Sequence, residues 1–422
     1  MEPHILILAG YCYPEQAASS YLGQNRNQVW VDEGFKIEII TPTPCRGLTP
    51  EMRKQYSSPE YKHEQIMDGG VTIHRFSMYA EGKNSLLRAL RYALCGFAHI
   101  WKGIFSKPAK DCNVMFIPST PPIAGAIAAI VKKCTGKKFV YNLQDIFPDS
   151  LVNNGLTKKG SLLWKIGRVI ENFTYRNADK IIVISNDFKE NIMAKGVPEE
   201  KIEVIYNWVE QNVVVDIPRE ENKLFDKYGL SRDKFYITYS GNIGLSQNMD
   251  MLLNVAKKIS ETTNIHFVLI GEGAYKAEVE KRVKEENIKN VTLLPFQPYE
   301  DISHVFSLGD MGLVISKPGT GAASVPSKTW SIMSASRPVL ANFDENELKT
   351  IIEQNKCGVF TKAGDENAFI VAILNMYKDR ELCKEYGRNG RQFVMDNLTK
   401  EVGTQKYVDV IKSVVAEAQK HG

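Results

Sequence analysis

Short apolar segments alternate with longer amphipathic segments along the whole chain. Several apolar segments lack polar residues on either face, which is typical of parallel strands covered by helices on both sides. The segments between them, such as Ser19–Glu33 and Ser161–Asn177, have helical periodicity, and Gly34 and Gly196 stand where helices should end. The predicted strands are His4–Ala9, Lys36–Thr41, Val71–Phe76, Val114–Pro118, Phe139–Leu143, Ile181–Ile184, Glu203–Tyr206, Phe235–Ser240, Ile265–Ile270, Val291–Leu294, Met311–Ile315 and Pro338–Ala341.

This alternation breaks once. After about residue 210 it weakens through the polar stretch VVVDIPREENK and then restarts. A chain of 422 residues is also too long for one ordinary core. We therefore predict an α/β protein with two Rossmann-like, doubly wound parallel sheets facing a cleft, with ligands at the carboxyl ends of the strands. The predicted domains are 1–210, 211–390 and a C-terminal helical segment, 391–422, that returns to the first domain.

Composition narrows the class of protein. The chain is 43% hydrophobic and 24% charged, as soluble globular proteins are, and its net charge of +4 does not indicate nucleic-acid binding. Seven cysteines without metal-type spacing indicate reduced thiols. The start lacks a signal peptide, and no segment nears the roughly 20 apolar residues of a membrane span. We predict a cytoplasmic protein.

The segment MGLVISKPGTGAASVPSKTWSIMSASRPVLA, residues 311–341, carries the strongest signal of a binding site. A strand leads into a loop of small residues, which lets the backbone approach a ligand closely. The helix start that follows offers unpaired N–H groups to an anion. This pattern predicts a site for a phosphorylated ligand, although Lys328 is also consistent with a solvated first-turn lysine. The expected contacts are Lys317, Gly321, Ser324, Ser327 and Lys328.

Two more loops follow strands of the same predicted sheet. Strand 235–240 ends in GNIG, and strand 265–270 ends in GEG. Either loop alone is as consistent with a tight turn as with a phosphate loop, but three loops at one sheet edge favour a binding site. The candidate residues are Gly241, Asn242, Gly244, Gln247, Gly271, Glu272 and Gly273.

An ordered set of motifs resembles a known family. The motifs are GYCYPEQAAS, NLQDIFPDS, ADKIIVISNDFKENIMAKGVPEEKIEVIYNWVE, GNIG, GEG and the 311–341 segment. Together they are similar to family-4 glycosyltransferases with the GT-B fold, along nearly the whole chain. The most similar branch makes O-antigen, capsule or colanic-acid units and includes N-acetyl-fucosaminyltransferases.

The resemblance implies a retaining enzyme of hexosyltransferase type. Its C-terminal domain would bind a UDP-sugar, and its N-terminal domain a polyprenyl-diphosphate-linked glycan, with no metal or other cofactor. Without a metal, helix N-termini and lysines must stabilise the leaving diphosphate. The resemblance places Phe296 near the base. Asn242 and Gln247 stand where the family commonly has Arg and Lys, and Ala323 and Ser331 stand where it commonly has two Glu.

Acceptor residues are expected in the N-terminal domain. The loop after the first strand has small residues where the family has Gly-Gly, and Gln144 and Asp145 match a His-Asp pair of the family. Asp145 could orient or deprotonate the acceptor hydroxyl, or it could cap a helix. We predict Asp145 and Lys328 as catalytic residues. The acceptor candidates are Glu15, Gln16, Ala17, Ser19, Gln144 and Asp149. For those in the loop after the first strand, an ordinary polar loop is the alternative.

One segment bears on a membrane partner. Residues 83–138 contain ten Lys or Arg and a single acid, Asp111. Within them, NSLLRALRYALCGFAHIWKGIFSK mixes large apolar with basic residues and could lie on an anionic membrane or cover the core with a basic outer face. We predict peripheral association with the inner face of the plasma membrane. A UDP-sugar 2-epimerase and a non-catalytic nucleotide-sugar-binding subunit remain open as alternative functions.

Overall fold

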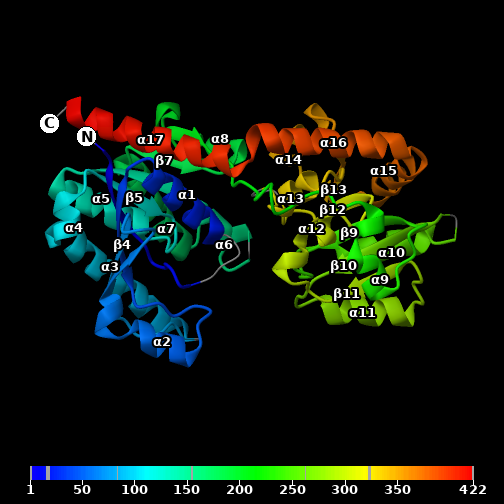
Figure 1. The fold of residues 1–422 in the computed structure, drawn as a ribbon, viewed down its shortest axis with the longest axis horizontal. Helices are drawn as coiled ribbons and strands as arrows, with labels where there is room; N and C mark the ends of the chain where they lie inside the picture. The colour runs from blue at the N-terminus through cyan, green and yellow to red at the C-terminus, as the bar shows by residue number, and fades with distance from the viewer. Residues whose placement is uncertain are drawn as a thin grey trace. The chain divides into compact units, whose positions relative to one another are not determined.

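The computed structural model describes residues 2–15, 20–82, 84–153, 155–261, 263–321 and 325–420. They form two units, residues 1–206 with 403–422 and residues 207–402 (Figure 1). The first division lies near the predicted limit 210/211, whereas the second lies twelve residues after the predicted limit 390/391. Residues 391–402 belong to unit 2 because they bond within it. Arg391 donates to the Val214 carbonyl (3.1 Å), and the Val209 N–H donates to the Leu398 carbonyl (3.0 Å).

Unit 1 is built on an eight-stranded sheet of order β3-β4-β2-β1-β5-β6-β7-β8. All neighbours are parallel except β3, which is antiparallel to β4. The central strands are buried because helices cover both faces. The strands are β1 His4–Leu8, β2 Lys36–Pro42, β3 His63–Ile66, β4 Val71–Phe76, β5 Val114–Pro118, β6 Lys138–Leu143, β7 Lys180–Val183 and β8 Ile202–Val204.

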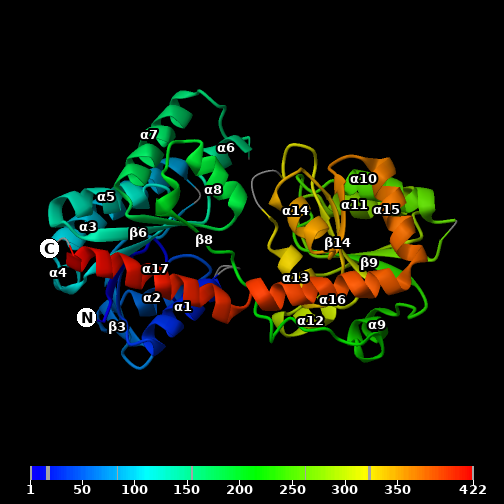
Figure 2. The same cartoon turned by 90° about the horizontal axis from the view of Figure 1, so that it is seen from above.

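Two helical layers enclose this sheet. Right-handed crossovers place α3, α5 and α7 on one face, while α1 and α17 cover the other (Figure 2). On the first face, α5 packs between α3 and α7. The helices are α1 Ser20–Asp32, α2 Pro50–Tyr56, α3 Ser85–Phe105, α4 Lys107–Asp111, α5 Ala124–Thr135, α6 Asp149–Asn153, α7 Leu162–Asn177, α8 Asn186–Met193 and α17 Lys400–Lys420, with 3₁₀ turns at Pro59–Lys62 and Glu199–Lys201.

Unit 2 is built on a six-stranded, wholly parallel sheet of order β11-β10-β9-β12-β13-β14. Its strands are β9 Phe235–Ser240, β10 Ile265–Ile270, β11 Val291–Leu294, β12 Met311–Ile315, β13 Val339–Phe343 and β14 Gly358–Lys362. Its helices are α9 Lys223–Tyr228, α10 Met249–Ile259, α11 Lys276–Glu285, α12 Ile302–Phe306, α13 Lys328–Ser334, α14 Glu347–Gln354, α15 Glu366–Lys378 and α16 Arg380–Asn397, with 3₁₀ turns at Arg219–Glu221 and Tyr299–Asp301.

The two doubly wound parallel sheets confirm the predicted fold class. All twelve predicted strands are present, with ends shifted by at most two residues. The sequence analysis missed β3 and β14. Both lie at sheet edges, where one side of the strand is open to solvent, so β3 (HEQI) and β14 (GVFTK) lack the apolar run by which the inner strands were found.

Each sheet has a point where strand order reverses. In unit 1 it lies between β1 and β5, and in unit 2 between β9 and β12. The loops that leave the carboxyl ends of two such strands run apart, which opens a crevice for a ligand. The structure therefore directs attention to the loops after β1 and β5 and to those after β9 and β12.

In unit 2, the loops after β9 and β10 pack backbone against backbone. A Cβ atom on Gly271 (φ +149°) would lie 1.9 Å from the Gly241 carbonyl oxygen. The Ile243 N–H also donates to the Glu272 carbonyl (2.8 Å). Glycine is therefore needed here for loop packing, independently of any ligand.

The substitution Gly271→Ala should destabilise the protein strongly. Overpacking costs about 1–3 kcal/mol and backbone strain about as much again. We expect the free energy of unfolding to fall by at least about 2 kcal/mol in urea denaturation. The control is Gly229→Ala, where φ is +61° and no atom lies within 4 Å of the added Cβ, so only about 1–2 kcal/mol of backbone cost is expected. Equal losses for both variants would contradict the packing argument.

Candidate active site

The site in unit 2 is a cavity of about 110 Å³ at the carboxyl ends of β9 and β12. It lies at the strand-order reversal, where an α/β sheet binds its ligands. Apolar side chains form part of the wall, and the polar groups come from the loops after β9 and β12 and from the start of α13. The lining residues are Ser246, Gln247, Val314, Ile315, Ser316, Thr320, Gly321, Pro326, Lys328 and Phe343.

Lys328, the first residue of α13, provides the positive charge of this cavity. Its Nζ lies 3.8 Å from the ring centroid of Tyr239, which is a cation–π distance. A Cβ on Gly241 would lie 2.9 Å from the same atom, so the ammonium sits against the loop after β9. Among the described residues, none forms a hydrogen bond or an ion pair with this ammonium.

Burial without a carboxylate partner lowers the pKa of Lys328 to about 7. The physical cause is loss of hydration, which disfavours the charged form. An anion entering the cavity would replace the missing water and favour the ammonium. The arrangement therefore suits a group that binds a negatively charged ligand and does not suit a structural ion pair.

The hydroxyl of Ser316 is a second polar group at the cavity wall. Ser316 is 4% exposed, and its Oγ has no hydrogen-bond partner within the described part of the chain. A buried hydroxyl without a partner is costly, so a ligand atom that hydrogen-bonds with it would be stabilised. The sequence analysis missed this residue because nothing local distinguishes it from other serines after strands.

The loop of small residues is partly occupied by a carboxylate of the protein itself. Asp344, just after β13, accepts hydrogen bonds from the N–H groups of Gly319 (2.9 Å) and Gly321 (2.7 Å). Of these two residues, Gly321 is one of the contacts that the sequence analysis expected for a phosphorylated ligand. In this structure both N–H groups bind Asp344, whereas neither the Lys328 ammonium nor the Ser316 hydroxyl has a hydrogen-bond partner among the described residues.

The loop after β9 is held by hydrogen bonds within the protein. The side-chain oxygen of Gln247 accepts from the Gly244 N–H (3.0 Å), and the Asn242 carbonyl accepts from the Tyr239 hydroxyl (2.6 Å). The loop after β12 joins it through the Lys317 N–H, which donates to the Ser246 carbonyl (2.7 Å). The predicted convergence of these loops at one edge is therefore present.

The remaining donor candidates lie outside the cavity lining. Lys317 places its ammonium 5.5 Å from the Tyr275 ring centroid, and Glu272 pairs with Lys276 at 2.7 Å. Phe296 is 72% exposed. Gly273 packs against the Ile243 carbonyl, Ser327 is exposed before α13, and Ser331 is partly exposed on α13. Ser324 lies outside the described residues. Contacts of all these residues with a donor remain predictions.

In unit 1, Glu15 holds two loops together. Its carboxylate accepts hydrogen bonds from the N–H groups of Cys12 (3.1 Å), Cys45 (2.8 Å) and Arg46 (2.9 Å). These bonds give Glu15 a structural task, and contact with an acceptor remains a prediction. Gln16, Ala17 and Ser19 lie outside the described residues.

Asp145 and Asp149 have different surroundings. Asp145 is exposed just after β6, and no described residue bonds or pairs with its carboxylate. It therefore caps no helix here, which leaves its carboxylate available. Asp149 instead pairs with Lys195 (2.6 Å), which also pairs with Glu171 (2.9 Å). Gln144 donates from its side chain to Asn142 (3.1 Å).

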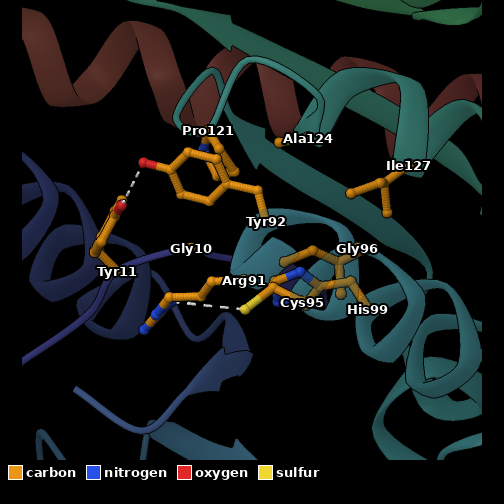
Figure 3. Close-up of a pocket in the computed structure, with 11 residues that line it drawn as sticks. Gly10, Tyr11, Arg91, Tyr92, Cys95, Gly96, His99, Pro121, Ala124 and Ile127 are labelled. Atoms are coloured by element: carbon orange, nitrogen blue, oxygen red, sulfur yellow. Dashed lines mark hydrogen bonds between the residues drawn. The ribbon is translucent and has the colours of Figure 1, made fainter. Parts of the chain in front are cut away.

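A second cavity lies at the strand-order reversal of unit 1, between α3, α5 and the loop after β1 (Figure 3). It measures about 10 Å³, room for roughly one water. Arg91 lines it, is 1% exposed, and donates to the Tyr79 carbonyl (3.0 Å) and the Cys45 thiol (3.3 Å). The sequence analysis missed this arginine, although Arg91, Cys95 and His99 follow a helical spacing of four.

Metal ligands are not grouped in the described ranges. Within them, no set of three or more His, Cys, Asp or Glu side chains could hold a metal ion. Metal independence itself remains a prediction. Across the same residues, no helix is both long enough and apolar enough to cross a bilayer.

Two family models match this chain. "Glycosyl transferase 4-like domain" matches residues 28–208, and "Glycosyl transferases group 1" matches residues 220–393. The chain belongs to the group 1, family-4-like glycosyltransferases. It is thus an enzyme of the hexosyltransferase type with the GT-B fold, as the resemblance implied.

Individual relatives agree with this assignment. WcaI of Escherichia coli (strain K12), named for colanic acid biosynthesis, is 27% identical over 72% of this chain and 74% of its own. The glycosyltransferase WbjE of Pseudomonas aeruginosa is 24% identical over 95% of this chain and 98% of its own. Among solved structures, Anabaena HepE in complex with UDP-glucose has a TM-score of 0.69 at 15% identity, covering 97% of this chain and 99% of that one.

The substitution Lys328→Met should make the folded enzyme more stable at neutral pH. The lowered pKa means that the folded state resists protonation of Lys328. The folding free energy lost in this way is present in full below pH 7. The loss disappears as the pH rises toward about 10.4, the pKa of lysine in the unfolded chain. We expect the variant to gain at least about 1.4 kcal/mol at pH 6.5 in urea denaturation, and less at pH 9.5. Lys281→Met, on an exposed lysine, is the control. A destabilised Lys328→Met protein at pH 6.5 would contradict this description of the cavity.

Proposed function

We propose that this glycosyltransferase moves a sugar from UDP to a lipid-linked glycan precursor during surface polysaccharide synthesis. The sugar we propose is an N-acetylated deoxyhexosamine, transferred with retention at the anomeric carbon. The acceptor is a glycan on polyprenyl diphosphate at the inner face of the plasma membrane. The names of WcaI and the bound UDP-glucose of HepE support the polysaccharide role and the UDP donor.

The observation that carries this proposal is the unpaired ammonium of Lys328 in the cavity of unit 2. Breaking a glycosyl–phosphate bond leaves added negative charge on the nucleoside diphosphate. A preorganised cation in a poorly hydrated site stabilises that charge more strongly than water does. Lys328 would supply this stabilisation, and the Ser316 hydroxyl would add a hydrogen bond to a phosphate oxygen.

The two alternative functions gain no support. The family models and the relatives named above are glycosyltransferases, with neither an epimerase nor a binding subunit among them.

UDP binding should be linked to proton uptake at Lys328. A bound diphosphate favours the ammonium, so the pKa rises from about 7 in the free enzyme, and binding above pH 7 takes up a proton. Between pH 7.5 and 9 the affinity should therefore fall by up to ten-fold per pH unit. Calorimetry in buffers of different ionisation heat measures the uptake directly.

Lys328→Met should abolish this uptake and weaken UDP binding about ten-fold or more, as expected for a lost charge-assisted hydrogen bond. Lys281→Met should change neither quantity. Addition of a chelator should leave binding intact. Absence of heat with UDP, or loss of binding in chelator, would overturn the proposed donor site.

Asp145→Asn should impair transfer without affecting donor binding. If the carboxylate orients or deprotonates the acceptor hydroxyl, its removal should lower kcat by about 10²–10⁴-fold. UDP affinity should stay the same because the donor site lies in the other unit. Asp68→Asn, in an exposed turn of unit 1, is the control. Full transfer activity in Asp145→Asn would remove this residue from the mechanism.

A further inference from the structure

Helix α3 of unit 1 packs apolar side chains against the core, buries two polar side chains, Arg91 and His99, and also exposes large apolar side chains on its outward face. Its inward face carries Arg91, Cys95 and His99, each at most 4% exposed. Its outward face carries seven large apolar side chains, with exposed fractions from 42% to 79%: Leu86, Leu87, Leu90, Leu94, Phe97, Trp101 and Phe105. A helix that only covered a core would turn these side chains inward.

The outward apolar face runs the whole length of the helix. Its residues recur at helical spacing over 21 residues, which is about 30 Å of helix. No charged residue falls in this stripe. Arg88 lies beside it and pairs with Glu81 at 3.4 Å. A continuous apolar surface of this size on a monomer marks an interaction site.

Helix α7 adds a second apolar surface on the same face of the sheet. Leu162, Leu163, Ile166 and Val169 are 49–76% exposed, and Leu156 in the preceding loop is 72% exposed. Helix α5 packs between α3 and α7, so the two surfaces flank one helix (Figure 2). The outward faces of α3 and α7, with Leu156, are the docking face.

The charges around the docking face are positive. Helices α3, α5 and α7 together contain one acidic residue, Glu171, which is 5% exposed and pairs with Lys195. Exposed Lys133 and Lys165 lie on α5 and α7, and exposed Lys158 and Lys159 precede α7. The remaining basic residues of the 83–138 segment are partly engaged elsewhere, since Lys132 pairs with Asp179 and Lys138 with Glu417.

We propose that the docking face binds an anionic lipid bilayer, with the side chains of α3 and α7 entering the interface between headgroups and acyl chains. Large apolar side chains flanked by lysines fit this partner, because apolar burial and attraction to anionic headgroups add together. A second copy of the chain fits poorly, since two positively charged faces would repel each other. The sequence left two alternatives for this segment, a helix lying on an anionic membrane and a core-covering helix with a basic outer face. The exposed apolar side chains of α3 favour the first, and α7 adds to the surface.

The inference rests on the proposed function only in that a lipid-linked acceptor requires a membrane. The small cavity of Figure 3 lies directly beneath α3. Docking by α3 would thus bring the bilayer close to the strand-order reversal of unit 1, on the side where acceptor residues are expected.

The test is co-sedimentation of the full-length protein with vesicles. One set is pure phosphatidylcholine, and the other contains equal parts of phosphatidylcholine and phosphatidylglycerol. We expect binding to the anionic vesicles, weakened in 1 M salt because the electrostatic part is then screened. Phe97→Gln with Trp101→Gln should reduce that binding about ten-fold or more, and Leu163→Gln with Ile166→Gln about three-fold or more, since each removes buried apolar area.

The control pair is Val371→Gln with Met395→Gln, on exposed apolar residues of unit 2, and it should bind vesicles like the original chain. UDP calorimetry on every variant separates the two proposals, because vesicle binding can be lost while the donor site remains intact. Equal vesicle binding by all three variants would overturn the docking face. So would light scattering that shows a dimer broken by the α3 pair, together with no vesicle binding by the original chain.

Discussion

The candidate site of unit 2 depends on the close backbone contact between the loops after β9 and β10. A Cβ atom on Gly271 would lie 1.9 Å from the Gly241 carbonyl oxygen, so the loop after β10 does not tolerate a side chain at the point of contact. This contact fixes the loop against which the Lys328 ammonium lies. It also leaves the Tyr239 ring as the nearest polarisable surface, 3.8 Å from Nζ. The cation is thereby positioned without a carboxylate.

A buried charge without a partner costs folding free energy, and proteins seldom keep one without a use. In unit 2 the cost coincides with the buried hydroxyl of Ser316, which has no hydrogen-bond partner among the described residues, and both groups line one cavity. Asp344 meanwhile satisfies the backbone N–H groups of the neighbouring loop. Asp344 and the loop N–H groups thus stabilise the fold, whereas Lys328 and Ser316 are available to a ligand. Because Lys328 can carry a positive charge, this pair suits an anion.

Unit 1 also has polar side chains in its interior and large apolar side chains on its surface, both on helix α3. Helix α3 buries Arg91 and His99 and exposes leucines, phenylalanines and a tryptophan. Arg91 is satisfied by a carbonyl and by thiols, and no carboxylate pairs with it within the described residues. Each unit therefore holds a basic side chain, Lys328 or Arg91, that no described carboxylate pairs with. Both lie near a strand-order reversal, where a ligand is expected.

The sequence by itself determined the architecture. Apolar runs, and glycines at the ends of strands and helices, predicted twelve strands and both sheets. They also predicted that the loops at 241–244, 271–273 and 317–321 converge. These signals can be read from the sequence because each involves only a few neighbouring residues. Tertiary structure alone decided which candidates are free. Glu15 binds the N–H groups of Cys45 and Arg46, 30 and 31 residues away in sequence, and Asp149 pairs with Lys195, 46 residues away. No described residue pairs with the carboxylate of Asp145 or the ammonium of Lys328. The outward turn of α3 was also invisible, because periodicity identifies an apolar stripe without telling which side of the helix the rest of the fold will cover.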